Sequence, residues 1–386
     1  MHYVRPTRAV ALAFVFLASN LLIAASSGAA VPMQPPPSIE ARAHILIDFQ
    51  TGAVLAEHNA DEPMEPASIT KVMTAYAAFK ALKEGRIKLT DPVTISEHAW
   101  KSEGSRSFVQ VGTQVPMEVL LKGMMVQSGN DATIAVAERI GGTEQAFAGI
   151  MNSYAKQLGM KNSHFENSTG LPGPTHRMSA RDIAILARAV IAEFPEYYRW
   201  YSLREYEWNG IKQQNRNGLL GRDPSVDGIK TGHTDSAGYC LATSANRGGM
   251  RLISAVLGTA SMKAREDASA ALLNYGYTFY ETVALKKKGE ALLSPRVYKG
   301  AVDMIPAVVA HDLWATVPRG SAASLVTTTT LNEPLIAPLA DDQPIGQVSI
   351  ADGATVISST PLVPQSAVAE GGWWSRLTDT VSLWMR

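Results

Sequence analysis

The stretch PMEPASITKVMTAYAAF, residues 63–79, marks the point where the chain turns from short strands into a long helical region. Pro66 suits the first turn of a helix, because the N–H group that proline lacks would be unpaired there. Apolar residues then recur at helical spacing, at Ile69, Val72, Met73, Tyr76 and Phe79. Ser68 and Lys71 are three residues apart and so share one face. The pattern places a serine hydroxyl beside a lysine where a helix enters a core.

This pair predicts a nucleophile and its base. A serine hydroxyl is a poor nucleophile at neutral pH and needs a base within hydrogen-bond reach. A lysine can be that base if its pKa falls from about 10.4 toward 7, a shift that costs roughly 4 kcal/mol. Burial, a helix N-terminus and a second cation all lower the pKa of a lysine. Lys71 has the first two conditions, and the third requires another cation.

Ser-x-x-Lys alone is a weak signal, because Ser153 and Lys156 repeat it in the middle of a predicted helix. That copy lies off the apolar stripe, and we interpret it as a solvated face. The first copy has two companions in order along the chain. Ser128-Gly129-Asn130 falls in a break between two helical patterns, and Lys230-Thr231-Gly232 falls in a predicted strand. The strand lysine would supply the second cation, and Gly232 would let a substrate backbone approach closely.

The order of the predicted elements indicates an α/β (α+β) fold. Residues 43–59 read as two strands joined by a turn, and strand patterns return in VDGIKTGHT, AGYCLATSAN and MRLISAVLGT. Helical patterns lie between them at 66–84, 116–126, 131–140, 143–158 and 179–193, and a further helix is expected over 263–283. We therefore expect one sheet built from the first hairpin and the late strands, with helices inserted.

The 386 residues are enough for more than one domain. We assign residues 38–288 to a catalytic domain and residues 289–366, rich in Val, Thr and Pro, to a small β-sandwich-like domain. Lys and Arg together number 35, as do Asp and Glu, so no basic excess argues for a nucleic-acid partner. The single cysteine, Cys240, lies in an apolar run and is interpreted as a small buried hydrophobe.

Both ends of the chain carry membrane-related patterns. Residues 1–30 have the basic start, apolar run and small-residue site of a secretory signal, and the Pro-rich residues 31–37 read as a linker. Residues 371–386 form an amphipathic pattern with three tryptophans, too short to cross a bilayer. We expect this segment to lie in the membrane surface. The alternative is an amphipathic helix docked on its own protein.

The three motifs resemble the Ser-x-x-Lys, Ser-[Asp/Gly]-Asn and Lys-Thr-Gly set of penicillin-recognising serine enzymes. The chain resembles the low-molecular-mass penicillin-binding proteins, the D-alanyl-D-alanine carboxypeptidases, over nearly its whole length. The resemblance implies a serine transpeptidase/β-lactamase-like catalytic domain with an antiparallel sheet. It also implies peptidoglycan stem pentapeptides and β-lactams as ligands, no cofactor or metal, and a place at the periplasmic face of the bacterial inner membrane.

The resemblance also implies a role for each motif residue. Ser68 would be the nucleophile and Lys71 the general base, while Ser128 and Asn130 would relay the proton and hold the substrate amide. Lys230 and Thr231 would bind the terminal carboxylate, beside Gly232. The backbone N–H groups of Ser68 and His233 would form the oxyanion hole. Two arginines are further candidates for the carboxylate, namely Arg265 and, more weakly, Arg216.

Three alternatives stay open at this point. A β-lactamase would share the acylation step, although the residues around Glu166 do not resemble the deacylation motif of class A enzymes. A DD-endopeptidase would cut crosslinks, and a wall-binding scaffold would carry a silent site. Some family members have a histidine before the glycine at the position of Thr169. This difference leaves the rate at which the acyl-enzyme is hydrolysed open.

Overall fold

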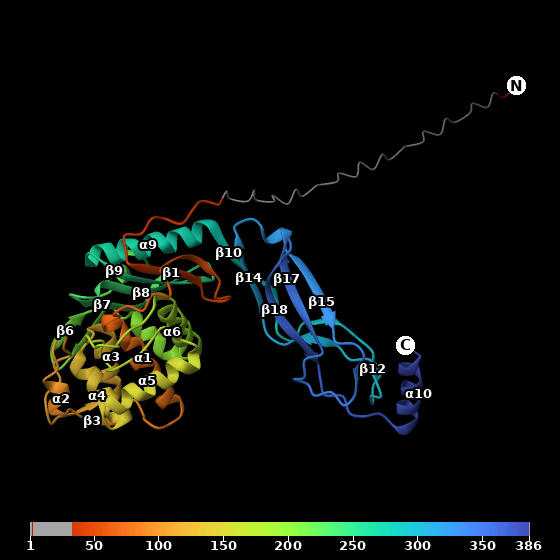
Figure 1. The fold of residues 1–386 in the computed structure, drawn as a ribbon, viewed down its shortest axis with the longest axis horizontal. Helices are drawn as coiled ribbons and strands as arrows, with labels where there is room; N and C mark the ends of the chain where they lie inside the picture. The colour runs from red at the N-terminus through yellow and green to blue at the C-terminus, as the bar shows by residue number, and fades with distance from the viewer. Residues whose placement is uncertain (1, 3–32, 386) are drawn as a thin grey trace.

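The computed structural model describes residue 2 and residues 33–385, arranged as two domains and a terminal helix (Figure 1). The expected signal segment falls, apart from residue 2, outside the described residues. The larger domain lies at the N-terminal side, and a β-rich domain extends away from it. The helix α10 (Trp373–Trp384) lies at the far end of the β-rich domain.

One antiparallel sheet of five strands organises the larger domain, in the order β2-β1-β9-β8-β7. Its strands are β1 (Ala43–Asp48), β2 (Val54–His58), β7 (Val226–Thr234), β8 (Gly238–Arg247) and β9 (Met250–Thr259). The first hairpin and the late strands therefore share one sheet, as predicted. Strand β7, which carries the Lys-Thr-Gly motif, is at the edge of the sheet.

Alternating side chains of the sheet belong to two different cores, because successive residues of a strand point to opposite faces. Ile45 and Ile47 pack with the inserted helices, whereas Leu46 packs with Leu272 on the other face. Leu272 lies on α9 (Met262–Phe279), which covers that face of the sheet (Figure 1). The domain is thus a sheet between one long helix and a helical body.

The helical body follows the predicted segments closely. Its α-helices are α1 (Lys71–Lys83), α2 (Glu97–Trp100), α3 (Met117–Val126), α4 (Asn130–Gly141), α5 (Glu144–Leu158), α6 (Ala180–Glu193), α7 (Pro195–Tyr198) and α8 (Leu219–Arg222). The 3-10 turns η1 (Ala67–Thr70) and η2 (Arg199–Ser202) and the strands β3 (Pro92–Thr94), β4 (Gln114–Pro116), β5 (Glu205–Trp208) and β6 (Ile211–Gln214) complete it. The helix expected from Pro66 begins as the tighter turn η1 and becomes α-helical at Lys71.

The prediction of a helix over 263–283 is wrong at its C-terminal end. Helix α9 ends at Phe279, and strand β10 (Tyr280–Lys286) follows at once. Strand β10 pairs with β14 (Leu313–Pro318) of the β-rich region, although the expected domain boundary places residues 280–288 in the catalytic domain. The pairing partner is more than 25 residues away in sequence, so local helical periodicity could not reveal it.

The β-rich domain has its own apolar core, formed by residues such as Val348, Ile350 and Leu362. Its main sheet has the order β11-β13-β18-β17-β15, and two-stranded sheets lie beside it. The remaining elements are β11 (Ala291–Leu293), β12 (Val297–Tyr298), β13 (Ala307–Val309), η3 (Ala322–Ser324), β15 (Val326–Leu331), β16 (Leu335–Ile336), β17 (Gly346–Asp352) and β18 (Thr355–Pro364).

A close contact between two helices suggests a test of the helical packing that holds Asn130. Gly141, at the end of α4, has room for no side chain, since a Cβ atom there would lie 2.7 Å from the backbone nitrogen of Phe147. Gly149, in α5, has open space around it. We expect Gly141→Ala to lower the free energy of unfolding by about 1–3 kcal/mol. Gly149→Ala, the matched control, should raise it by up to about 1 kcal/mol. Urea unfolding followed by circular dichroism measures both, and equal effects would contradict the packing described.

Candidate active site

The serine and the lysine of the first motif are in direct contact. Ser68 lies in η1 and is partly exposed, whereas Lys71 begins α1 and is only 1% exposed. Lys71 Nζ donates to Ser68 Oγ at 2.9 Å and to the carbonyl oxygen of Thr169 at 2.7 Å. Since the two atoms are already within hydrogen-bond distance, a neutral Lys71 could accept the proton of Ser68 once the hydroxyl becomes the donor in this contact.

The second motif reaches the same place from the connection between α3 and α4. Ser128 has φ +68°, a left-handed backbone conformation that is strained for a serine. Asn130 is the first residue of α4 and is held by its backbone N–H, which donates to the carbonyl oxygen of Ser105 at 2.6 Å. Ser128 Oγ and Asn130 Oδ1 are buried, and neither has a partner among residues 33–385. Such atoms suit contacts with a bound molecule.

The third motif packs against the serine turn along strand β7. A Cβ atom at Gly232 would lie 2.7 Å from the carbonyl oxygen of Pro66 and 3.1 Å from Ala67 Cβ. The structure thus gives a reason for this glycine that differs from our expectation, because the chain's own backbone approaches it. Lys230 and Thr231 precede it and are buried, and His233 follows it exposed.

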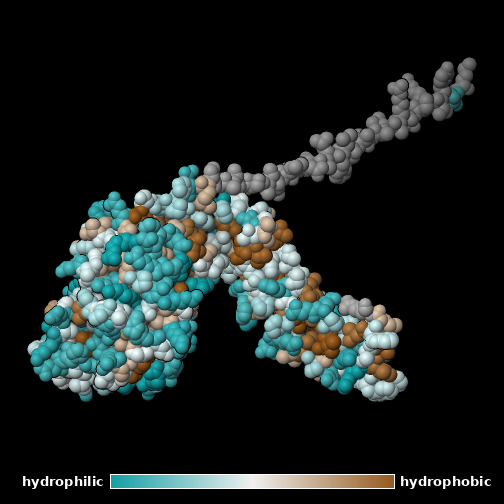
Figure 2. Space-filling view, in the orientation of Figure 1, coloured by the Kyte–Doolittle hydropathy of each residue, from teal (hydrophilic) through white to brown (hydrophobic). Residues whose placement is uncertain are grey.

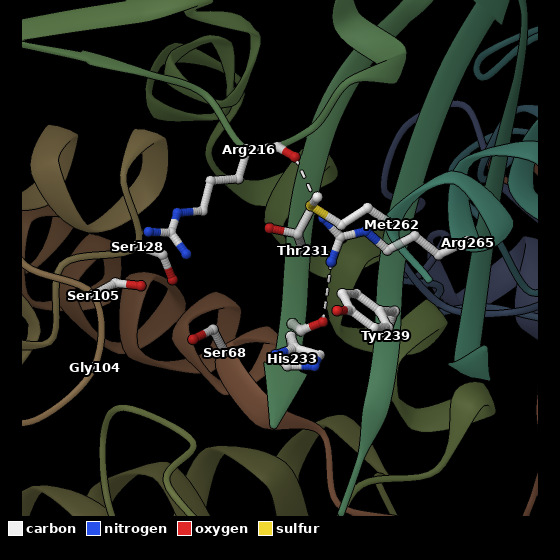
Figure 3. A pocket seen from close by; sticks show the side chains of 11 residues that line it. Ser68, Gly104, Ser105, Ser128, Arg216, Thr231, His233, Tyr239, Met262 and Arg265 are labelled. Atoms are coloured by element: carbon white, nitrogen blue, oxygen red, sulfur yellow. Dashed lines mark hydrogen bonds between the residues drawn. The ribbon is translucent and has the colours of Figure 1, made fainter. Parts of the chain in front are cut away.

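Two arginines complete the site from opposite sides (Figure 3). Arg265, on α9, is 3% exposed, donates to the carbonyl oxygen of Gly232 at 3.2 Å and lies over the ring of Tyr239. It does not pair with the neighbouring acids of its helix, because those bind Arg222 instead. The guanidinium of Arg216 points toward Ser128 in Figure 3. The weaker of the two arginine candidates therefore lies in the site as well.

These groups surround one cavity of about 600 Å³. Its lining consists of Ser68, Gly104, Ser105, Ser128, Arg216, Thr231, Gly232, His233, Tyr239, Met262 and Arg265. Lys71, Asn130 and Lys230 lie behind this surface, buried. Gly104, Ser105, Tyr239 and Met262 were missed in the sequence, where none of them belongs to a motif. Their only signal is proximity in the chain to Arg265, to the Lys-Thr-Gly strand or to the loop before α3.

The electric field of the site suits a lysine base. Burial, followed by the positive charge of Arg216, lowers the pKa of Lys71 to about 7, against the opposing influence of Glu144 and Asp131. Burial, and then repulsion by Lys71, Arg216 and Arg265, holds the pKa of Lys230 well below its ordinary value. We expected Lys230 to be the second cation beside Lys71, but Arg216 is the cation that acts most strongly on it. The positive charge of Lys71 disfavours the charged form of Lys230.

The predictions for the second Ser-x-x-Lys copy and for the cysteine are confirmed. Ser153 and Lys156 are exposed on α5, remote from the cavity lining. Cys240 is fully buried in β8, and burial raises the pKa of its thiol to about 11. Neither group is poised for reaction in this structure.

Known proteins match the chain over most of its length. Residues 30–261 match the family described as D-alanyl-D-alanine carboxypeptidase, and residues 280–370 match the C-terminal domain of penicillin-binding protein 5. The D-alanyl-D-alanine carboxypeptidase DacA of Escherichia coli K12 is 43% identical, over 90% of this chain and 88% of its own. DacC of the same organism is 41% identical, over 96% and 94%. Penicillin binding protein 5 from Haemophilus influenzae superposes with a TM-score of 0.83 at 41% identity, over 87% of this chain and all of that one.

The fold is therefore that of the penicillin-binding proteins, with an N-terminal peptidase domain and a C-terminal β-rich domain. The chain belongs to the D-alanyl-D-alanine carboxypeptidase family.

The pKa of Lys71 predicts how the reaction depends on pH. Since only the neutral amine can accept a proton, acylation by a labelled penicillin should speed up as the pH rises through about 7. Arg216→Gln removes a cation that favours the neutral form, so this rise should move to higher pH. Arg139→Gln, at a surface arginine that pairs with Asp91, should leave it in place. Stopped-flow acylation rates against pH would be measured for the wild type and both variants. If the rate of Arg216→Gln rises over the same pH range as that of the wild type, the assignment is contradicted.

Proposed function

We propose that this carboxypeptidase removes the terminal D-alanine of peptidoglycan pentapeptides through an acyl-enzyme on Ser68, and that penicillins acylate the same oxygen. The observation that carries the proposal is the hydrogen bond between Lys71 Nζ and Ser68 Oγ, at the wall of a cavity that residues of the other two motifs also line. Neutral Lys71 accepts the proton of Ser68, and the freed oxygen bonds to the carbonyl carbon of the penultimate residue.

The other motif residues take part in the steps that follow. The backbone N–H groups of Ser68 and His233 stabilise the oxyanion, typically by about 3 kcal/mol per donor. Ser128 passes a proton to the nitrogen of the departing D-alanine, and Asn130 holds the substrate amide. The C–N bond breaks, and water later hydrolyses the ester to release Ser68.

A cluster of cations receives the substrate carboxylate. Thr231 and Arg265 line one side of the cavity, and Arg216 reaches it from the other. Lys230 precedes Thr231 in β7 and is buried behind this lining. A buried Lys230 that is reluctant to carry charge becomes cationic when an anion arrives, since an opposite charge raises its pKa. Binding of the terminal carboxylate is thereby favoured, which suits a peptidase that cuts at a free C-terminus.

The competing activities are less well supported. Glu166, the loop glutamate compared above with the class A deacylation motif, accepts hydrogen bonds from Thr175 and does not line the cavity. We therefore propose slow deacylation rather than rapid β-lactam hydrolysis, and the acyl-enzyme lifetime separates the two. A DD-endopeptidase is separated by assaying a pentapeptide against a crosslinked dimer, and a silent scaffold by any D-alanine release.

The identity of the nucleophile can be tested with the second Ser-x-x-Lys sequence as a control. Ser68→Ala should lose the covalent penicillin adduct and at least a thousandfold of the D-alanine release, because the residue that forms the intermediate is gone. Ser153→Ala, in the second Ser-x-x-Lys, should keep both. Intact-mass spectrometry after incubation with penicillin G gives the adduct. An adduct that persists in Ser68→Ala would overturn the assignment.

We further propose that the protein is exported and acts at the periplasmic face of the inner membrane, bound through residues 371–386. Helix α10 docks on the β-rich domain by its polar side, where buried Asp379 accepts from the Arg296 guanidinium at 2.8 Å and from the Lys299 backbone N–H. Its apolar side chains point outward instead: Trp373, Trp374, Leu377, Val381, Trp384 and Met385 are all about half exposed or more. Apolar residues gather at this end of the molecule in Figure 2.

The sequence left open whether this helix lies in the membrane surface or docks on its own protein, and the arrangement of α10 has features of both. A helix docked only on its own protein would hide its apolar face, whereas α10 buries its acidic residue, Asp379, and displays its tryptophans, which favour the headgroup region of a bilayer. Across residues 33–385, none of the helices is long and apolar enough to span a membrane. The geometry favours a helix lying in the membrane surface.

Deletion of residues 371–386 should abolish sedimentation with phospholipid vesicles and leave penicillin acylation at the wild-type rate, because α10 lies at the opposite end of the molecule from the cavity (Figure 1). A matched variant, Trp373→Ser with Trp384→Ser, should weaken vesicle binding with the helix still present. Sedimentation that is unchanged by either alteration would refute the anchor.

A further inference from the structure

The loop between α5 and α6 packs directly against the turn that carries the nucleophile. It supplies the Thr169 carbonyl to Lys71, and the carbonyl of Ser168 accepts from Thr74 Oγ1 at 2.7 Å. Gly170 adopts φ +87°, and a Cβ atom there would lie 1.8 Å from the carbonyl oxygen of Ala67. The position of this loop and the position of the catalytic turn are therefore coupled.

His176 joins the far arm of the same loop to the turn. The side chain is 1% exposed and contacts the ring of Phe165 edge-on. Its Nδ1 lies 3.2 Å from the backbone nitrogen of Glu166, and a backbone N–H can only donate. Nδ1 is therefore the acceptor, and the proton of the neutral ring is on Nε2. Nε2 then donates to Thr70 Oγ1, at 2.8 Å.

We infer that His176 is a positioning residue for the peptidase reaction, acting through Thr70. Thr70 immediately precedes Lys71, so the hydrogen bond fixes the end of η1, where the chain passes from Ser68 to its base. The same imidazole bonds Glu166, three residues before Thr169, and so ties the carbonyl that holds Lys71. One side chain thus aligns both the lysine and its backbone acceptor.

The surroundings of His176 keep it in the tautomer that this role requires. Burial is the main cause that lowers its pKa to about 4, with the charges of His164 and Arg177 acting in the same direction and those of Glu166 and Glu65 opposing them. The ring is therefore neutral at neutral pH. A second proton on Nδ1 would face the Glu166 N–H, and two donors cannot share a hydrogen bond.

Four variants test the inference in the full chain. His176→Asn keeps an acceptor near Nδ1 and removes the donor to Thr70, and Thr70→Val removes the acceptor with little change in shape. Each should lower the acylation rate constant for a labelled penicillin at least tenfold, with little change in the non-covalent affinity. His176→Gln, whose amide can reach Thr70, should recover most of the rate. His164→Asn, at an exposed histidine of the same loop, should match the wild type.

The double variant separates positioning from general stability. If His176 acts through Thr70, His176→Asn combined with Thr70→Val should be no slower than the slower single variant. Losses that multiply in the double variant would overturn the inference. Single variants that melt at a lower temperature but acylate at the wild-type rate would also overturn the inference, because His176 would then contribute to stability only. All rates are taken well below the melting temperature of each variant, so a less stable protein still gives an answer.

Discussion

The burial of Lys71 is the interaction on which the rest of the site depends. An ammonium group that loses its water shell is destabilised, and the fall of its pKa from 10.5 to about 7 corresponds to about 5 kcal/mol of lost preference for the charge. That energy must come from the packing of η1, α1 and the loop that supplies the Thr169 carbonyl. The retained hydrogen bonds to Ser68 and Thr169 keep the amine oriented while it is neutral. The ability of Lys71 to act as a base thus depends on its removal from water.

The backbone around this lysine is held where few residues fit. Ala67 and Ser128, both beside the cavity, have positive φ angles of 48° and 68°, conformations that cost of order 1–3 kcal/mol each. Gly232 and Gly170 allow β7 and the α5–α6 loop to approach the carbonyl oxygens of Pro66 and Ala67 from two sides. The turn that carries Ser68 is therefore packed between two other backbone segments. A side chain at either glycine would displace this turn.

Local pattern accounts for much of what the sequence predicts correctly. The apolar stripe after Pro66 predicted α1, and runs of strand-forming residues bounded by turn residues predicted β7, β8 and β9, because these signals depend on near neighbours. The motif around Ser68 became convincing through its companions and its position at a helix start, whereas the exposed copy at Ser153 has neither. The family resemblance rests on the same three motifs, which explains why the fold and activity could be anticipated together.

What the sequence missed depends on contacts between distant segments. Arg216 acts on Lys71 only because the chain after β6 returns to the cavity, and Tyr239 and Met262 line it only once β8 and α9 are packed. Strand β10 was read as the end of a helix, since its partner β14 is known only from the fold. The need for glycine at Gly232 was attributed to a substrate, because the approach of Pro66 is not visible in the sequence.

The junction between the domains contains a buried polar cluster. Asp48, at the end of β1, is fully buried and accepts from the Thr51 N–H and from Thr282 Oγ1 of the β-rich domain, each within 2.8 Å. Thr51 also contacts Thr316 at 2.6 Å. Separation of the domains would take the Thr282 donor from this buried carboxylate and leave only the donors of Thr51, at a cost in free energy. Helix α10 is in turn held to the β-rich domain by its own buried carboxylate, Asp379, so a buried acid joins each end of that domain to the element beside it.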